Sequence, residues 1–341
     1  LGRAAEGEID PLFAELYRWY AAHPEAGIPA ETYRKAAFLR CADGVIGKSA
    51  ASALYGDTLK NSATRLEKYA ACAFAHFMEF GLQIRERDQY ELKAADMGTV
   101  MHEALEKFSK KLQENGETWK TVGDDTRDRL IEECVEETMA DYGNTIFQSS
   151  SRNQYRIIRV KRILKRTVWA LQQQIRQGEF EPGEFEVSFS MEDSLSAINI
   201  DLSEHEKMRL RGRIDRVDLC ETDDKVYVKI IDYKSGNTTF SLLNLYHGLQ
   251  LQLVVYMNAA LELEAKKHPG KRAVPAGMFY YHIEDPMVDG SGTESEEEIR
   301  QAVLEELKPN GLVNDDPEIY GAMDTELSGS SAVIPVALKA D

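Results

Sequence analysis

Apolar residues recur at helical spacing along the first half of the chain. Near the N-terminus, Leu12, Leu16 and Trp19 lie three or four residues apart, which predicts short helices around a break at residues 26–29. Further on, the same periodicity predicts longer helices over residues 64–81, 96–114, 125–142 and 151–177. We therefore expect the first half of the chain to be mainly helical.

At Pro182 the helical period gives way to alternation. Phe185, Val187 and Phe189 alternate with polar neighbours, as in a half-buried strand. Two further strand-like runs flank a turn-rich segment and predict a hairpin, and more elements follow it: strands over 210–220, 226–234, 276–283 and 332–339, and helices over 241–266 and 294–307. This order of elements predicts an α/β or α+β core decorated with helices.

The predicted hairpin brings ionisable residues together. If its turn has four residues, Val217 lies opposite Ile230, Asp215 lies directly across from Asp232, and Lys234 follows two residues later. Two carboxylates about 4–6 Å apart repel each other by a few kcal/mol, which a divalent cation such as Mg²⁺ or Mn²⁺ offsets. Taken alone, however, an Asp-x-Lys spacing in a strand favours solvated charges at the strand end.

Composition limits the function classes. The chain has 341 residues, enough for about two domains. Its net charge of −17 argues against a protein whose main role is to coat nucleic acid. No apolar run is long enough for a membrane span, and no secretory signal is visible. Four cysteines without a CxxC pair argue against a zinc site or a disulfide framework and favour the reducing cytoplasm.

Several motifs together resemble a known family. They are Gly212-Arg213-Ile214-Asp215, Ile231-Asp232-Tyr233-Lys234-Ser235-Gly236, Gln252-Leu253-Val254-Val255-Tyr256 and Gly98-Thr99-Val100-Met101-His102-Glu103. This combination closely resembles the RecB-type nuclease domain of the PD-(D/E)XK superfamily, and segments 62–81 and 275–289 look most like the AddB subunits of bacterial AddAB helicase–nucleases. The resemblance implies a restriction-endonuclease-like mixed sheet flanked by helices over residues 61–341, with residues 1–60 as a helical remnant of a helicase-like region.

The resemblance also implies roles for individual residues. Asp215 and Asp232 match metal ligands of Mg²⁺ or Mn²⁺, and the Tyr233 carbonyl matches a further one. Lys234 matches the catalytic lysine, and His102 the histidine on the metal side. The family's Q-x-x-x-Y element is matched by Gln252 and Tyr256, and Glu186 matches loosely a preceding acidic residue. For His102, Tyr256 and Glu186, a purely structural or solvated role is the alternative.

AddB proteins hold a 4Fe-4S cluster on one cysteine before the nuclease core and three near the C-terminus. Cys72 matches the first, but no cysteine follows Cys220 in this chain. We therefore expect no complete cluster within these residues. Since the chain also begins without Met, we expect it to be a piece of a longer protein that stops before the remaining cluster ligands.

A basic helix is the candidate contact to DNA. Seven basic residues and no acidic residue lie between positions 152 and 166, and Arg152, Arg156 and Arg159 share one helix face. These arginines are candidates for DNA backbone contacts, with a solvated helix face as the alternative.

The resemblance implies a metal-dependent DNA exonuclease domain. It would hydrolyse phosphodiesters of single-stranded DNA during double-strand break processing, with DNA delivered by a helicase partner of the AddA type. One alternative is a catalytically silent module for DNA binding or assembly. Intact Asp215, Asp232 and Lys234 argue against it. A stand-alone nuclease is a further alternative, against which the N-terminal helices argue.

Overall fold

The computed structural model describes residues 7, 10–27, 30–37, 46–56, 58–87, 92–141, 147, 150–190, 195, 198–203, 206–290 and 292–338. The chain divides into two compact units, Leu1–Ala53 and Leu54–Asp341. The first unit contains short helices: α2 (Pro11–Ala22), a 3₁₀ turn (Pro24–Ala26), α3 (Ala30–Ala37) and most of α4 (Lys48–Tyr55). Asp10 caps α2 by accepting a hydrogen bond from the Leu12 amide, with Pro11 at the first helical position.

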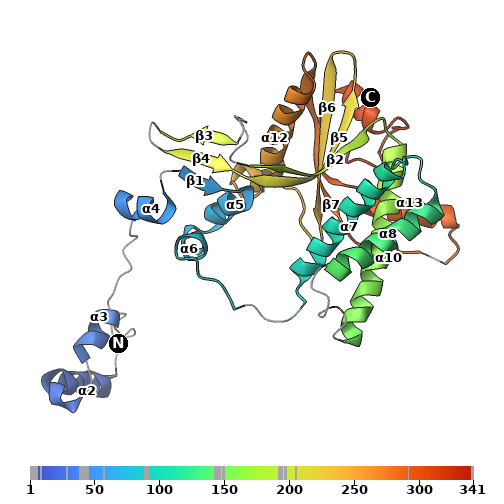
Figure 1. Ribbon diagram of the computed structural model, residues 1–341. Coiled ribbons are helices and arrows are strands. Elements are labelled where there is room, and N and C mark those ends of the chain that lie inside the picture. Colours follow the sequence, from blue (N-terminus) through green and yellow to red (C-terminus); the bar gives the residue numbers. More distant parts are fainter. Residues whose placement is uncertain are drawn as a thin grey trace. The chain divides into compact units, whose positions relative to one another are not determined.

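The second unit is built around a five-stranded mixed sheet in the order β2-β5-β6-β7-β8 (Figure 1). The strands are β2 (Glu181–Phe189), β5 (Gly212–Glu221), β6 (Lys225–Lys234), β7 (Arg272–His282) and β8 (Asn310–Val313). Only the β6–β7 pair is parallel; the other neighbours in this sheet are antiparallel. The predicted mixed α/β fold is thereby confirmed.

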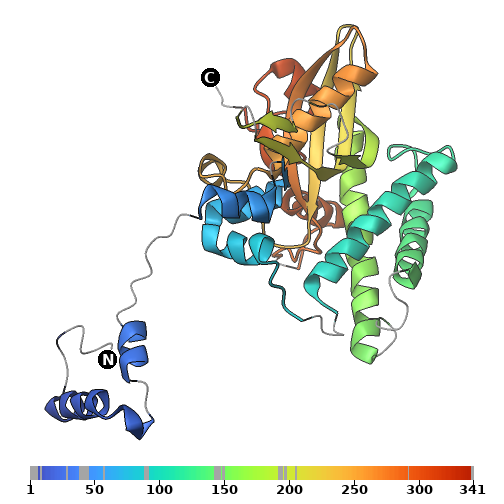
Figure 2. The same cartoon turned by 60° about the vertical axis from the view of Figure 1, so that its left-hand side comes forward.

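Helices cover both faces of this sheet (Figures 1 and 2). One face packs against α7 (Ala94–Glu114) and α10 (Ser151–Arg176), on which α8 (Asp124–Asp141) packs in turn, and the other face packs against α12 (Gln252–Lys267). Alternate residues of β6 enter the two cores: Tyr227 and Ile231 face α7 and α10, whereas Val228 and Ile230 face α12. The central strands are buried on both sides, because helices cover both faces of the sheet.

A smaller three-stranded sheet, in the order β1-β4-β3, lies beside the large one (Figure 1). It consists of β1 (Thr58–Asn61), β3 (Asn199–Asp201) and β4 (Lys207–Leu210). The remaining elements are α5 (Ala63–Ala71), α6 (Ala73–His76), a π-helical turn (Phe77–Gly81), α11 (Leu242–Tyr246), α13 (Glu296–Glu306) and α14 (Pro317–Met323). Within the described residues, no helix is long and apolar enough to cross a lipid bilayer.

Three expectations about elements are wrong. The helix predicted over 64–81 is interrupted at Cys72, which caps the N-terminus of α6 through its thiol. The helix predicted over 241–266 is two helices, because the chain turns at Gly248 with a φ of +73° that favours glycine. In place of a strand over 332–339, the described residues form a single bridge between Ser330 and Ala337.

Candidate active site

The hairpin of β5 and β6 has the predicted register. Val217 pairs with Ile230 and Arg216 with Ile231, so continuing the ladder by one residue brings Asp215 beside Asp232. Both carboxylic side chains are buried, with residue exposures of 7% and 2%. An Asp215 carboxylate oxygen accepts a hydrogen bond of 2.7 Å from the Tyr233 amide. The backbone of β6 therefore fixes the position of Asp215.

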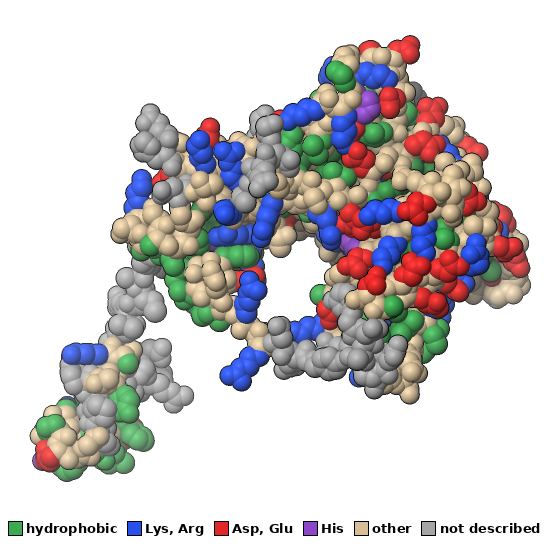
Figure 3. All heavy atoms as spheres, viewed as in Figure 1, with side chains coloured by type: hydrophobic (Ala, Val, Ile, Leu, Met, Phe, Trp, Pro, Cys, Tyr) green, Lys and Arg blue, Asp and Glu red, His purple; other side chains and the backbone are tan. Residues whose placement is uncertain are grey.

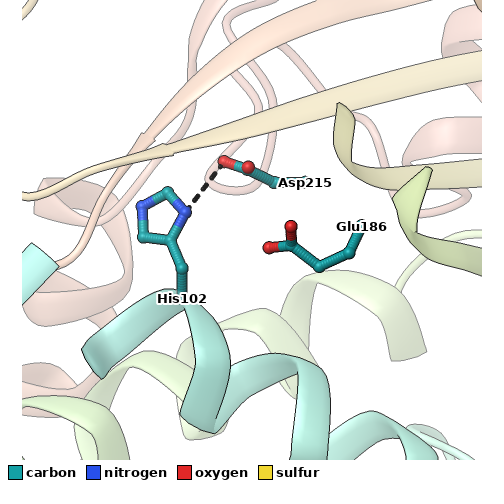
Figure 4. Close-up of side chains that lie close together, drawn as sticks. All are labelled: His102, Glu186 and Asp215. Atoms are coloured by element: carbon teal, nitrogen blue, oxygen red, sulfur yellow. Dashed lines mark ion pairs between the residues drawn. The ribbon is translucent and has the colours of Figure 1, made fainter. Parts of the chain in front are cut away.

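Helix α7 and strand β2 bring two further side chains to Asp215 (Figure 4). His102 Nδ1 lies 3.3 Å from Asp215 Oδ2, and ligand atoms of His102, Glu186 and Asp215 all lie within 4.8 Å of one another. Helix α7 passes close to the end of β6. At Gly98, an added Cβ atom would lie only 3.0 Å from the Ser235 hydroxyl. This close approach positions His102 one helical turn further along.

Glu186 has an unusual backbone. Its φ of +51° lies in the left-handed region, which non-glycine residues seldom occupy outside functional sites and turns. At this residue the side-chain alternation of β2 reverses: Phe185 packs towards α7 and Val187 towards α12. The predicted strand is therefore present, but Phe185 and Val187 do not share one face. The Glu186 carboxylate, ion-paired with Arg213, is directed into the group with His102 and Asp215.

Asp232 belongs to a hydrogen-bond network centred on a side chain of α12. Gln252 Nε2 donates to Asp232 Oδ1 at 2.8 Å and to the Tyr256 hydroxyl at 3.1 Å, and Gln252 Oε1 accepts from Lys234 Nζ at 2.9 Å. Lys234 Nζ also lies 2.5 Å from Asp232 Oδ2 and 5.1 Å from the centre of the Tyr280 ring. The amide of Gln252 thus holds the lysine, the carboxylate and the phenol together.

The electrostatics of this region favour a bound cation. Burial, and next the charge of Asp215, raise the pKa of Asp232 to about 6, although Lys234 opposes the shift. Burial and Asp215 likewise raise the pKa of Glu186 to about 7. Burial lowers the pKa of His102, but its hydrogen bond to Asp215 and the nearby carboxylates outweigh this and raise it. The raised pKa values show that these neighbouring carboxyl groups ionise with difficulty in the absence of added positive charge. A bound divalent ion supplies that charge and stabilises the ionised carboxylates.

The side chains present also fit such an ion chemically. Carboxylate oxygens are the ligands that Mg²⁺ and Mn²⁺ prefer, and an imidazole nitrogen is a common ligand of divalent transition metals. Asp215, Glu186 and His102 offer these atoms within one small region, and Asp232 is the next carboxylate along the hairpin. The residues therefore fit a divalent metal. The ligands expected from the sequence share Asp215 and His102 with this group of three, but include Asp232 and Tyr233 in place of Glu186.

Two features near the site were not predicted from the sequence. A Glu67 carboxylate oxygen on α5 accepts hydrogen bonds from the Leu251 and Gln252 amides at 2.6 and 3.0 Å, which caps α12. Behind the site, Arg216 forms a two-bond ion pair of 2.5 and 2.6 Å with Asp218, and both residues are buried. Glutamate in a helix and alternating charges in a strand are ordinary surface patterns, so neither pattern indicates a helix cap or a buried ion pair.

The other predicted site residues lie elsewhere. Arg152 and Arg159 on α10 are exposed, and Arg156 Nη1 donates to the Leu92 carbonyl at 3.1 Å. The basic residues that follow on the same helix are ion-paired with carboxylates: Lys161 with Glu136, Arg162 and Arg166 with Asp285, and Lys165 with Glu132. Cys72 is exposed between α5 and α6.

Comparison with known proteins connects this site to a family. The family model described as PD-(D/E)XK nuclease superfamily matches residues 60–323, which is most of the chain and the whole of the site. The chain belongs to the PD-(D/E)XK nuclease superfamily. The superfamily name states an acidic residue followed by a (D/E)-X-K element, and Asp232, Tyr233 and Lys234 at the end of β6 fit that element.

Curated relatives of this chain carry a more specific name. The B-type subunit of the ATP-dependent helicase/deoxyribonuclease of Lachnoclostridium phytofermentans is 43% identical over 98% of this chain. The proteins of the same name from Alkaliphilus metalliredigens and Acetivibrio thermocellus are 39% and 36% identical over 97% and 100% of it. The chain spans only 28–30% of the length of these relatives.

Proposed function

We propose that this chain is a Mg²⁺- or Mn²⁺-dependent deoxyribonuclease domain that acts as an exonuclease on single-stranded DNA. The observation that carries the proposal is the convergence of His102, Glu186 and Asp215 next to the Asp232–Lys234 pair in a member of the PD-(D/E)XK superfamily. The names of the relatives, which include both helicase and deoxyribonuclease, support DNA as the substrate.

Each residue has a definite task in this proposal. Asp215 and Asp232 would hold the metal, together with His102, Glu186 or the Tyr233 carbonyl. When bound, the metal would lower the pKa of a water molecule and neutralise charge on the phosphate. Lys234 supplies a positive charge for the developing negative charge on the phosphate oxygens. Gln252 keeps the Lys234 ammonium group in place, and Tyr256 supports Gln252 through its hydroxyl.

The wider assignments extend this proposal and rest on the family resemblance of the sequence. We propose that the domain works in the cytoplasm with a helicase subunit of the AddA type, in processing of double-strand breaks. Residues 1–60 would belong to the helicase-like region and residues 61–341 to the nuclease domain. In a longer protein, Cys72 would be one ligand of a 4Fe-4S cluster whose other ligands lie outside this sequence, because one thiolate cannot hold a cluster that needs four.

The test compares two lysines at opposite ends of one strand. The purified chain is incubated with an end-labelled single-stranded oligonucleotide in Mg²⁺, in Mn²⁺ and in EDTA. We expect Lys234→Ala to lower metal-dependent cleavage by at least about 100-fold, the scale of a lost charge-stabilising group. The matched control is Lys225→Ala at the start of β6, where the lysine pairs with Glu318 and lies far from the site. We expect this control to retain cleavage.

Two results would contradict the proposal. Cleavage that persists in folded Lys234→Ala would remove the lysine from the mechanism. DNA binding without any metal-dependent cleavage by the unmodified chain would instead identify a catalytically silent module. Thermal melts of both variants separate loss of activity from loss of the fold.

A further inference from the structure

The small sheet has one strongly basic face. Lys60 on β1 pairs in register with Arg209 on β4, and Thr58 pairs with Lys207. Since side chains alternate along a strand, Lys60, Lys207 and Arg209 point to the same side. Arg211 directly follows β4 at the next position of the same alternation. We call Lys60, Lys207, Arg209 and Arg211 the basic face.

The opposite side of this sheet is apolar and covered. Leu210 is buried and Met208 is partly buried in the same core cluster as the apolar residues of α12. Lys60, Lys207 and Arg211 are exposed, and Arg209 is half-buried. The sheet can therefore not rotate its cations inward, and the basic face is held towards the exterior by the packing behind it.

The charge of this face is largely uncompensated. Across the described ranges, no ion pair joins Lys60, Arg209 or Arg211 to a carboxylate, and Lys207 has only a 4.0 Å contact with Asp201. The basic residues 161–166 of α10 are, in contrast, each paired with a carboxylate. Figure 3 shows Lys and Arg side chains gathered over the small sheet and α5, whereas most acidic side chains in this view lie over the right half of the unit.

A second observation connects the basic face to the active site. The Arg211 amide donates to the Asn61 carbonyl at 3.0 Å, so the small sheet is joined directly to the start of β5. Arg209, Arg211, Arg213 and Asp215 then follow at every second position. At about 3.3 Å per residue, Arg209 and Asp215 are at most about 20 Å apart along the chain. Arg209 and Arg211 therefore lie on the same stretch of chain as Asp215, and Arg213 between them is paired with Glu186 of the site.

We propose that the basic face binds the phosphate backbone of single-stranded DNA and guides the strand into the active site. This inference rests on the proposed nuclease function, since it takes the substrate of the same site as its ligand. Polyanionic phosphate complements an uncompensated row of cations in a chain with a net charge of −17. Contacts of this kind position the strand and carry no base specificity.

The experiment measures binding separately from cleavage. Affinity for a fluorescent oligothymidylate of about 20 nucleotides is measured by anisotropy in EDTA over a series of salt concentrations. Two double variants, Lys60→Gln with Lys207→Gln and Arg209→Gln with Arg211→Gln, each remove two charges. At about 0.7 per phosphate contact, each pair should reduce the slope of log affinity against log salt by about 1.4, which is about 25-fold weaker binding at about 0.1 M salt.

The matched control removes two lysines near the C-terminal end of α12. Lys266→Gln with Lys271→Gln changes the net charge equally at the end of α12 and just before β7, where Lys271 pairs with Glu221. This control should keep the slope of the unmodified chain. Because the first pair of lysines is exposed, its substitution tests the proposal even if the Arg209 variant does not fold.

The outcomes separate the inference from the proposed function. An unchanged slope in folded variants would overturn the inference, as would equal weakening in the control. Weaker binding of an acidic protein partner with unaltered DNA binding would also overturn it and assign the face to that partner. Failure of the unmodified chain to cleave DNA with metal would contradict the nuclease function and leave the binding measurement, made in EDTA, as an independent result.

Discussion

Replacing Asp232 by Asn should stabilise the metal-free protein at neutral pH. The side chain is only 3% exposed, and burial and the charge of Asp215 raise its pKa from 3.8 to about 6. The folded state thus binds this proton more tightly than the unfolded chain, so the contribution of Asp232 to stability falls as the pH rises from about 4 to about 6. Asparagine resembles the protonated form at every pH.

The size of the effect follows from the shift. A difference of about two pKa units corresponds to about 3 kcal/mol at pH 7.5, and to about half of that at pH 5, where the folded carboxyl is still mostly protonated. We therefore expect urea denaturation in EDTA to show Asp232→Asn above the unmodified protein by these amounts. The variant should at the same time lose DNA cleavage and most of the stabilisation that we expect Mg²⁺ to give to the unmodified protein.

Asp218→Asn is a matched control with the opposite sign. Burial disfavours ionisation of Asp218, but Arg216 and Lys229 outweigh burial and hold its pKa below the ordinary value. The folded state therefore favours the ionised form, and Asp218→Asn should destabilise the protein at pH 7.5, by about 3–5 kcal/mol for a broken buried ion pair. Lower stability of Asp232→Asn at pH 7.5 would refute the reasoning, because it would show that Lys234 already compensates Asp232 without a metal.

Two further predictions concern the surroundings of the site. Glu67→Ala should lower the free energy of unfolding by about 1 kcal/mol in chemical denaturation and also reduce cleavage, because two amides at the start of α12 lose their acceptor. Glu67→Gln keeps an acceptor oxygen and should restore most of the stability and most of the cleavage. Equal cleavage in the two variants would exclude a positioning role for Glu67. Changing Arg152, Arg156 and Arg159 together to Gln should reduce the salt slope of single-strand binding by roughly two units if they contact phosphates, whereas an unchanged slope would assign that face of α10 to solvent or to a protein partner.

The hairpin register could be predicted because two simple patterns agree. The turn at residues 222–225 and the alternation of apolar residues on both sides of it leave one arrangement that buries the apolar face, and Val217 pairs with Ile230 accordingly. The position of Asp215 beside Asp232 follows without any knowledge of the rest of the fold. Local sequence was sufficient here because strand pairing across a short turn is itself local.

The remaining features depend on contacts that a single segment does not encode. The alternation of Arg216 and Asp218 with apolar residues is typical of a solvated face, yet α7 and α10 cover it and the two charges pair in the interior. The turn of the chain at Glu186 and the cap that Glu67 provides to α12 likewise require partners far away in sequence. Patterns of polarity indicate which residues are unfavourable to bury, but not which of these residues find a hydrogen-bond or ion-pair partner in the interior.

The pairing of β1 with β4 has a consequence for folding. These strands are parallel neighbours although Thr58 and its partner Lys207 are about 150 residues apart, so their pairing closes a long loop. The hairpin of β5 and β6, in contrast, closes through a four-residue turn. A pairing between distant segments loses the entropy of loop closure before its contacts stabilise the chain. The small sheet should therefore assemble after the large one. The carboxylates would then be in place before the basic face forms, and a partly folded chain would hold the proposed catalytic groups without the surface proposed to receive the strand.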